Sequence, residues 1–462
     1  MPGLERLNSL DLNTQSSLLS GFKKILKLAL PMLCSQILAV FSGFLCMLML
    51  GHVSHGVLAA SALIFSLQTT LMIIGTSLLM VLAYMIGHAM GVKKYDWVGV
   101  YVQHGFLIAF CTGVLIFILS SFLGPILLAL KESPVLVPIV VKFFNIYRFS
   151  FFALVSSMVL AQLFYGTQHA PQVFLRSALS CVVLVLVAWV LIHGDLGFPA
   201  LGVQGFAIGI LIQNLVLILT LVLYITRHDS FKKFGIFHLR FFKHWGQLGQ
   251  MLKSGWPICV QMSGELLAFS AAAVMVGWLG TNPLAAYQIV IQCWFLLVIV
   301  VFGLSHSMGI LVGQARGENN WNQIRALLKA GFAITLIFVL LIALIFIIFP
   351  KFLTNLFIHP GQPNYVGTLI LTIPLFAVIA LNQFFDGFRN VMIGGLRGLL
   401  DTRFPMWLSL ILLWLVGMPL SYLFGFVLHG GLIGIAFGST LGMIIAVILI
   451  ALRWRMHLRN NK

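Results

Sequence analysis

The sequence predicts an all-α polytopic membrane protein, with twelve transmembrane helices arranged as two parallel repeats of six helices. Hydrophobic residues make up 61% of the 462 residues and charged residues only 8%, whereas soluble domains carry roughly 25% charged residues. Twelve predominantly apolar segments are each about 20 residues long or longer, which is the length that a helix needs to cross the hydrocarbon core. The first six and the last six of these segments also match each other in sequence.

The twelve segments follow one another along almost the whole chain. Residues 1–21 have no basic region followed by an apolar core, so we expect a polar cytoplasmic tail and no cleaved signal peptide. The expected domains are this tail, an N-terminal bundle (22–226), a cytoplasmic connector (227–248), a C-terminal bundle (249–452) and a cytoplasmic tail (453–462). The expected helices span residues 25–50, 57–87, 98–123, 135–165, 174–192, 202–226, 249–276, 284–313, 327–350, 364–394, 405–428 and 431–452.

The charges predict the orientation of these helices. With the N-terminus in the cytoplasm, nearly all basic residues fall on the inner side, Arg397 among them, and the outer loops carry only Lys131 and Lys351. This asymmetry follows the positive-inside rule, so we expect both termini in the cytoplasm and the chain in the plasma (inner) membrane. The net charge of +17 is then explained by membrane orientation. Basic residues scattered over inner loops form no continuous face for a nucleic acid, so none is expected as a partner.

The connector between the halves is both basic and aromatic. Its sequence from Arg227 contains FKKFGIFHLRFFKHW. One interpretation is an amphipathic segment that lies on anionic lipid. A plain solvated linker is the other.

The internal repeat has an offset of 226 residues. At this offset Lys27 matches Lys253 and Pro31 matches Pro257, in segments whose other residues are mostly apolar. Further matches are Gly51 with Gly277, Gly87 with Gly313, and Gly91 with Gly317, and later, at an offset of 229, Gly202, Gly205 and Gly209 with Gly431, Gly434 and Gly438. Two halves of six helices each have the same orientation. Secondary transporters are often built from such repeats, with their sites between or within the halves.

Cysteine and histidine residues give no sign of a cofactor or a metal site. All six cysteines lie within the apolar segments, without CxxC or Cys/His spacing. His306 lies in the middle of the eighth segment between Ser305 and Ser307. It is the nearest approach to an enzymatic constellation, but no carboxylate accompanies it in sequence.

Glu265 and Asp386 are the best indication of function. The chain has only ten acidic residues, and these two lie inside long apolar segments. A carboxylate is costly to bury in hydrocarbon, so such residues usually lie on an ion or substrate pathway. An interhelical hydrogen bond is the structural alternative, and it contributes only about 0.6 kcal/mol on average.

Several segments resemble those of the multidrug and toxic compound extrusion (MATE) family. The most specific are GGLRGLLDTRFPM (394–406), VGQARGENNWNQIRALLKAG (312–331) with its first-half counterpart IGHAMGVKKYDW (86–97), and WPICVQMSGELLAFS (256–270). The resemblance extends over roughly residues 22–452. It implies two six-helix bundles around a central cleft and export of amphipathic, often cationic compounds in exchange for H⁺ or Na⁺.

The resemblance also implies roles for single residues. Glu265 matches the helix 7 acid of the family, and Asp386 matches the helix 10 acid. Many bacterial members have a further acid in helix 1, where this sequence has Cys46 within GFLCMLMLGHVS. This departure argues against a coupling mechanism that needs a carboxylate in the first half.

Both acids head polar or aromatic stripes at helical spacing. Gln261 and Phe269 lie at i−4 and i+4 of Glu265, and Asn382, Gln383, Arg389 and Asn390 lie at i−4, i−3, i+3 and i+4 of Asp386. An Arg389–Asp386 pair would hold Asp386 ionised. Glu265 has no basic residue at i±3 or i±4, and burial favours the neutral form of an unpaired carboxyl. We therefore expect Glu265 to be the exchangeable site.

Together with the resemblance, these features predict secondary-active multidrug efflux by a monomer without a cofactor. Gln288 and Trp294 are further candidates for lining the cleft, since aromatic faces suit a flat organic cation. The chain has no GxxxxGK[ST] segment, which argues against ATP-driven pumping. The alternatives are a lipid-linked saccharide flippase of similar architecture, a membrane-embedded enzyme, and a receptor or channel.

Overall fold

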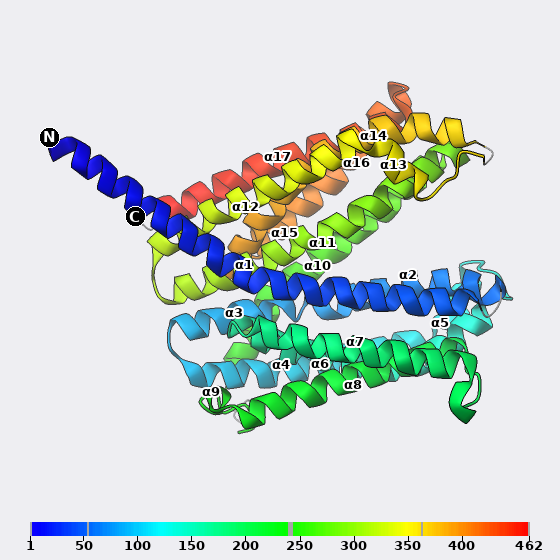
Figure 1. Cartoon of the computed structure of the whole chain (residues 1–462), viewed down its shortest axis with the longest axis horizontal. Helices are drawn as coiled ribbons and strands as arrows, with labels where there is room; N and C mark the ends of the chain where they lie inside the picture. Colours follow the sequence, from blue (N-terminus) through cyan, green and yellow to red (C-terminus); the bar gives the residue numbers. More distant parts are fainter. Residues whose placement is uncertain (1, 53–54, 239–243, 362–363, 461–462) are drawn as a thin grey trace. The chain divides into compact units, whose positions relative to one another are not determined.

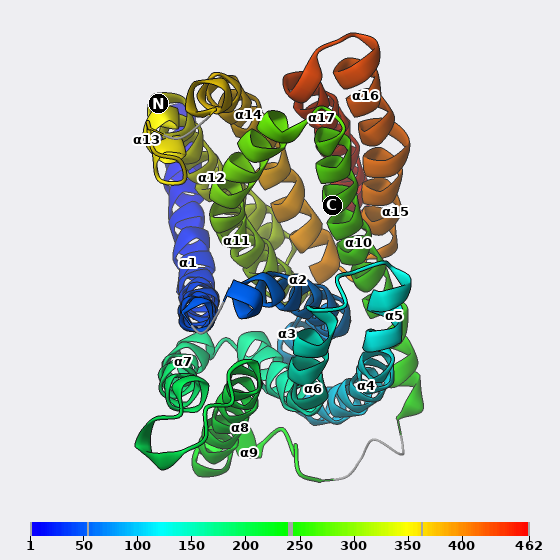
Figure 2. The same ribbon diagram turned by 90° about the vertical axis from the view of Figure 1, so that its right-hand side faces the viewer.

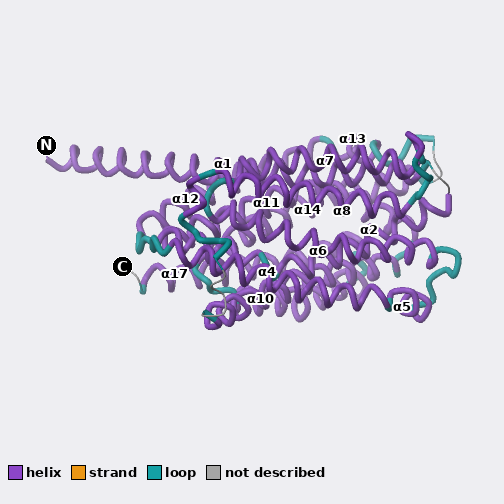
Figure 3. Tube along the Cα trace, turned by 90° about the horizontal axis from the view of Figure 1, so that it is seen from below, coloured by secondary structure: helices purple, strands orange, loops and turns teal. Residues whose placement is uncertain are grey.

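The structure is a computed structural model that describes residues 2–52, 55–238, 244–361 and 364–460. These residues form helices and loops, without a β-strand among them (Figures 1 and 3). Twelve of the helices described are long and apolar enough to cross a membrane, which confirms the predicted number. The helices of the six spans in the first half are α1 (Pro2–Gly51), α2 (His55–Ser77), α3 (Met80–Gly91), α4 (Tyr95–Ser121), α6 (Val137–Gly166), α7 (Ala170–His193) and α8 (Val203–Arg227). Helices α2 and α3 together form one span, Ala59–Gly91.

The second half contains six of the twelve spans. Five of them are α10 (Trp245–Gly277), α11 (Thr281–Gly317), α12 (Trp321–Ile348), α14 (Tyr365–Gly398) and α17 (Gly431–Arg459), and the sixth, the segment 403–427, runs between the last two. Short helices are α5 (Leu123–Ala129), η1 (Asp195–Gly197), α9 (Asp229–Lys232) and α13 (Pro350–Asn355).

Two predicted helices differ from the structure in continuity. The expected helix 57–87 is divided into α2 and α3 by a turn, in which the Leu79 amide donates to the Thr76 carbonyl at 3.0 Å. The expected helix 405–428 consists of α15 (Arg403–Leu410), a π-helix η3 (Ile411–Gly417), α16 (Met418–Tyr422) and a second π-helix η4 (Leu423–Val427). Hydropathy reveals the length of an apolar segment but not the hydrogen-bonding pattern within it. π-Helical turns are rare and often occur at functional sites.

The chain forms two compact units. The first comprises residues 30–259, and the second comprises residues 1–29 and 260–462. The boundaries fall inside α1 and α10, so each of these two helices contributes to both units.

Helix α6 is the centre of the first unit. It packs against α2, α3, α4, α7 and α8, and Figure 2 shows α3, α4, α6 and α8 side by side. The face of α6 that points into the unit carries Phe143, Phe144, Tyr147 and Phe151, all fully buried. Their rings contact one another, with centroids 5.2 Å apart for Phe143 and Phe144. Aromatic side chains of this size account for much of the buried apolar area in a core.

Helix α14 is the centre of the second unit. It packs against α11, α12 and α17, which lie beside it in Figure 1. Two glycines permit the close approach to α11, because a Cβ at Gly394 or Gly398 would overlap the backbone carbonyls of Ser305 or Gly309. Small residues at a helix interface allow such backbone contact in membranes. This contact fixes the rotation of α14 and therefore the direction of its polar stripe.

Candidate ion-coupling and substrate site

The polar stripe of α14 meets the polar stripe of α10 inside the second unit. Glu265 is 7% exposed, Asp386 3% and Arg389 3%. The Nη1 atom of Arg389 lies 2.8 Å from Oε1 of Glu265, and the Nη2 atom lies 2.8 Å from Oδ1 of Asp386. Arg389 Nε also donates to Oδ1 of Asp386 at 3.0 Å. One guanidinium therefore joins two carboxylates from different helices.

The predicted Arg389–Asp386 pair is present, but Glu265 is also paired with a base. The expectation that Glu265 lacks a basic partner considered residues on its own helix only. The structure brings Arg389 to it from α14. Glu265 and Asp386 therefore share Arg389 as a counterion, and they differ in the number of hydrogen bonds that hold each carboxylate.

The Asp386 carboxylate accepts more hydrogen bonds than the Glu265 carboxylate. Two guanidinium nitrogens of Arg389 reach its Oδ1, and Asn390 Nδ2 donates to its Oδ2 at 2.9 Å. The Oε1 atom of Glu265 accepts one hydrogen bond from Arg389 Nη1 and one from Gln261 Nε2, the latter at 3.0 Å. Since each charge-assisted bond favours the ionised carboxylate, Asp386 is the more firmly held charge of the two.

Two further polar side chains contact this group: the Ser409 hydroxyl oxygen accepts hydrogen bonds, and Arg397 donates one. Ser409, from α15, contacts both Arg389 Nη1 at 3.0 Å and Gln261 Nε2 at 3.1 Å. Arg397 Nη2 donates to Oε1 of Gln261 at 3.0 Å and is itself 3% exposed. The cluster thus has two carboxylates and two guanidinium groups. Buried charges in a membrane protein require such pairing and hydrogen bonding.

Arg397 and Ser409 are members of the cluster that the sequence did not predict as site residues. Arg397 was expected only as an orienting charge on the inner side of the membrane, and the structure shows in addition that it is buried in the last turn of α14. One signal was available in the sequence. Eleven residues separate Asp386 from Arg397, and eleven residues at 3.6 per turn return to nearly the same helix face. Nothing in the sequence around Ser409 distinguishes it from other serines.

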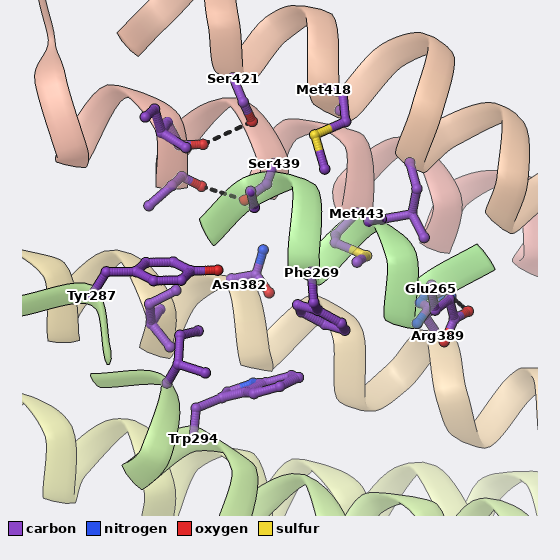
Figure 4. A pocket seen from close by; sticks show the side chains of 18 residues that line it. Glu265, Phe269, Tyr287, Trp294, Asn382, Arg389, Met418, Ser421, Ser439 and Met443 are labelled. Carbon is purple, nitrogen blue, oxygen red and sulfur yellow. Dashed lines mark hydrogen bonds and ion pairs between the residues drawn. The ribbon is translucent and has the colours of Figure 1, made fainter. Parts of the chain in front are cut away.

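A cavity adjoins the cluster (Figure 4). Glu265 and Arg389 line it together with an aromatic wall, and Figure 4 shows these two side chains next to each other and the rings of Phe269 and Trp294 close together. The ring centroids of Phe269 and Trp294 are 4.9 Å apart. Further lining residues are Ala268, Ala272, Tyr287, Ile291, Ile379, Asn382, Leu413, Gly417, Met418, Ser421, Ile435, Ala436, Ser439 and Met443.

The cavity is small in this conformation. Its volume is about 80 Å³, and a water molecule takes up about 30 Å³ in the liquid, whereas pockets for drug-sized ligands measure roughly 300–1,000 Å³. It therefore has room for a few water molecules. Part of its wall is π-helical, because Leu413 and Gly417 lie in η3.

The other residues predicted to line the cleft differ in whether they lie in the cavity lining. Trp294 Nε1 donates a hydrogen bond to Oε1 of Gln383 at 2.5 Å, and this bond links α11 to α14. Asn382 lines the cavity and donates to Oγ1 of Thr440 at 3.3 Å. Gln288 is exposed and lies outside the cavity lining.

Ser305 and Ser307 are engaged with the backbone. The Ser305 hydroxyl donates to the Asn390 carbonyl at 2.6 Å, and the Ser307 hydroxyl donates to the Leu304 carbonyl at 2.9 Å. His306 between them is buried and has an interaction partner. The two hydroxyls are thus used to hold helices and are poorly placed to act as nucleophiles.

The first unit has no comparable charged cluster among the residues described. Its buried polar side chains are serines, threonines, glutamines, asparagines and histidines, and its acids are exposed or half-buried. Cys46, at the position where a first-half acid was considered, is fully buried.

Comparison with known proteins places the chain in a family. The model of the MatE family matches residues 31–190 and 257–423, more than half of the chain. The chain belongs to the MatE family of membrane transporters and is therefore a transporter and not an enzyme.

Named relatives extend over nearly the full length. The chain is 28% identical over 444 residues to a probable multidrug resistance protein NorM of Agrobacterium fabrum, with 96% of this chain and 95% of that protein covered. It is 27% identical over 437 residues to a protein of the same name from Brucella suis, with 94% and 93% covered.

Solved structures share the fold. The crystal structure of the eukaryotic MATE transporter AtDTX14 superposes with a TM-score of 0.84 at 20% identity, with 96% of this chain and 99% of that chain covered. A MATE crystal structure in the bent conformation gives a TM-score of 0.86 at 17% identity, with 97% and 98% covered. At these identities the likeness establishes the fold alone.

Proposed function

We propose that this transporter is a secondary-active antiporter that exports amphipathic, mostly cationic organic compounds in exchange for protons. The observation that carries the proposal is the buried Glu265–Arg389–Asp386 cluster at the edge of an aromatic cavity. Two relatives bear the name of multidrug resistance proteins, which supports drugs as the substrate class. Sodium is the alternative coupling ion, because a pair of carboxylates also provides the oxygen ligands that a hard cation prefers.

Glu265 is the exchangeable site in this mechanism. Glu265 lines the cavity, whereas Asp386 is not among the lining residues. It is also tied to Arg389 by one nitrogen only. A proton that enters the cavity can therefore reach Glu265 first. Protonation of Glu265 weakens its ion pair with Arg389 Nη1, while the ion pair between Arg389 and Asp386 remains. Asp386 serves as the fixed charge that keeps Arg389 in place.

The drug and the proton compete for the same carboxylate. A cationic drug in contact with the rings of Phe269 and Trp294 would bring its charge towards Glu265, and aromatic faces attract such cations. Protonation of Glu265 removes the negative charge on which this attraction depends. Loading of protons from outside then favours release of the drug. Because the cavity in the described conformation is too small for a drug, binding requires the unit to open, and the π-helical part of its wall is a suitable place for that change.

Orientation, location and oligomeric state are part of the same proposal. We place both termini and the connector in the cytoplasm and the chain in the plasma (inner) membrane, as a monomer, because the basic residues gather on one side of the spans. No nucleic acid or cofactor takes part.

Reconstituted protein tests the proposal. Efflux of a fluorescent organic cation is measured in proteoliposomes with a pH gradient and a Na⁺ gradient imposed separately. A pH gradient without Na⁺ is expected to drive uphill efflux. A strict requirement for Na⁺ would retain the site and replace the ion, and transport that needs neither gradient would overturn the antiport mechanism.

A further inference from the structure

A basic pocket lies in the first unit and shares no lining residue with the candidate transport site. It is lined by Lys93, Lys94, Tyr95, Asp96, Trp97 and Lys233. Three membrane spans end beside it, since one span finishes at Gly91, the next begins at Tyr95 and a third finishes at Arg227. The pocket is therefore at the level of the membrane surface. In Figure 1, α9 lies at the same end of the unit as the turn between α3 and α4.

The part of the connector that carries Lys233 is fixed to the unit. Phe231 and Phe234 are 2% and 1% exposed, and the ring of Phe231 lies 4.9 Å from that of Phe164. The carbonyl of Phe234 approaches Gly99 so closely that a Cβ there would overlap it. Further along, Gln103 Nε2 donates to the carbonyls of Ile236 at 2.9 Å and His238 at 2.6 Å. Lys233 is thus held beside Lys94 by packed aromatic rings and hydrogen bonds.

The described part of the connector is not the plain solvated linker of one interpretation, because it packs on the first unit. Residues 239–243 lie outside the described residues. From Asp229 to His238, a short helix, α9, is followed by turns that pack on α4.

The pocket has a net positive charge, and two of its lysine side chains lie over aromatic rings. Three lysines face one aspartate among its six lining residues. Lys94 Nζ lies 4.5 Å from the centroid of the Trp97 ring, and Lys233 Nζ lies 4.5 Å from that of Tyr95. Cation–π contacts restrict a lysine without neutralising its charge. The adjacent Lys232 differs, because it forms an ion pair with Asp229 at 2.6 Å.

We propose that this pocket binds the phosphate group of an anionic phospholipid from the leaflet next to the basic loops. Its position between the ends of three spans brings it to the depth of lipid head groups, and tryptophan and tyrosine side chains such as Trp97 and Tyr95 are enriched at that depth. Basic clusters next to membrane spans attract anionic lipids. A lipid bound here contacts both the α3–α4 turn and the connector.

Binding of lipid by purified variants tests the site. The protein in neutral detergent is titrated with phosphatidylglycerol or with phosphatidylcholine, and the bound lipid is counted by native mass spectrometry. The test variant carries Lys93→Gln, Lys94→Gln and Lys233→Gln. The matched control carries Lys23→Gln, Lys24→Gln and Lys27→Gln, which remove the same charge from exposed positions on α1, outside the pocket.

The wild type and the control are expected to retain phosphatidylglycerol equally well. Each lysine of the pocket is expected to contribute about a fivefold preference for the anionic lipid bound there, so the test variant should lose affinity by a factor on the order of 100. Lys94→Arg alone should retain binding, because the charge and the contact with Trp97 are kept. Equal losses in the two triple variants would overturn the site and leave only a general charge effect.

A titration with inorganic phosphate distinguishes a phospholipid head group from free phosphate as the ligand of the pocket. If phosphatidylglycerol is the ligand, phosphate at millimolar concentration does not displace it and does not raise the melting temperature of the protein. Stabilisation of the wild type by phosphate, lost in the test variant and without any preference for phosphatidylglycerol, would overturn the assignment to lipid. Neither readout requires transport activity, so the result is independent of the proposed antiport.

Discussion

Arg389 joins Glu265 of α10 to Asp386 of α14, with its Nη1 and Nη2 atoms each 2.8 Å from a carboxylate oxygen. All three side chains are at least nine-tenths buried. Removing one member of a buried ion pair leaves an uncompensated charge, which costs about 3–5 kcal/mol. The arginine is therefore the group on which both acids depend.

Replacement of this arginine tests the dependence. Arg389→Ala should destabilise the second unit by about 3–5 kcal/mol because two carboxylates lose their counterion. Thermal unfolding in detergent measures the loss, with Lys329→Ala on the exposed face of α12 as the control. The double variant Arg389→Ala with Glu265→Gln should recover part of the stability. A double variant that is less stable than Arg389→Ala would contradict the shared-counterion arrangement.

The same variant should change the response of transport to pH. Without the guanidinium, both carboxyl groups are protonated more readily, so the pH profile of efflux should move to higher pH. An unchanged profile in Arg389→Ala would show that the ion pairs are not coupled to transport.

The sequence predicted the spans and the composition of each helix face, and missed the contacts between helices. Periodicity correctly placed Gln261 with Glu265, and Arg389 and Asn390 with Asp386, because each of these pairs lies on one helix. The contact between Arg389 and Glu265 depends on which helices are neighbours and how they are rotated. That rotation is set by close backbone contacts, such as that of Gly394 with Ser305, which no single-helix pattern reveals.

Asp401 should make stability depend on pH. It lies between α14 and α15 and accepts hydrogen bonds from Arg453 Nε at 2.8 Å and from His457 Nε2 at 2.9 Å. Burial alone would raise the pKa of Asp401, but the hydrogen bonds from His457 and Arg453 and their positive charges outweigh it and hold the pKa below its usual value. The ionised Asp401 carboxylate therefore contributes its full stabilisation above the unfolded-state pKa of an aspartate, about 3.9. This stabilisation is lost as the pH falls through the lower pKa that Asp401 has in the folded state.

The variant Asp401→Asn measures this contribution. It should be less stable than the wild type by about 1–2 kcal/mol at pH 7, a value for charge-assisted bonds reduced because Arg453 is partly exposed. The difference in melting temperature should shrink below about pH 4. Repeating the series in a His457→Gln background leaves Arg453 as the remaining partner. A difference that widens towards low pH would be inconsistent with the hydrogen-bonded carboxylate.

Trp294 should contribute to the affinity for flat organic cations. Trp294→Leu removes a ring from the cavity wall and the hydrogen bond to Gln383, and should weaken binding about 5- to 20-fold, within the range of a cation–π contact. Trp294→Phe keeps a ring and should lose less. Fluorescence anisotropy of a bound fluorescent cation gives the dissociation constants. Trp278→Leu, which changes a tryptophan that is 65% exposed and outside the cavity, serves as control. Equal effects at both tryptophans would exclude a specific role for the cavity.

The orientation of the chain can be tested without measuring transport. Reporter fusions at residue 235, within the connector, and at the C-terminus should both behave as cytoplasmic, since basic residues orient a membrane protein with their loops inside. A fusion after Lys131, in a predicted outer loop, should give the opposite signal. An extracellular signal at residue 235 would reverse the proposed topology.

Glu265 should be essential for gradient-driven efflux. Glu265→Gln keeps the size of the side chain and its contact with Gln261 while fixing the site as neutral, so efflux should fall at least about 100-fold with little change in expression. The repeat supports this separation of roles, because Ala39 occupies the matching first-half position and a bundle of this type therefore folds without an acid there. Glu265→Asp should retain partial activity, since a carboxylate that is shorter by one methylene group still titrates.

Asp386→Asn and Gln288→Ala complete the comparison. Asp386→Asn should also impair efflux, but through loss of the charge that holds Arg389, so its melting temperature should fall more than that of Glu265→Gln. Gln288→Ala, at an exposed position outside the cavity, should transport normally. The measurement is uphill efflux from proteoliposomes under an imposed pH gradient. Undiminished efflux by Glu265→Gln would refute its assignment as the exchangeable site, and equal destabilisation by Glu265→Gln and Asp386→Asn would remove the distinction drawn between the two acids.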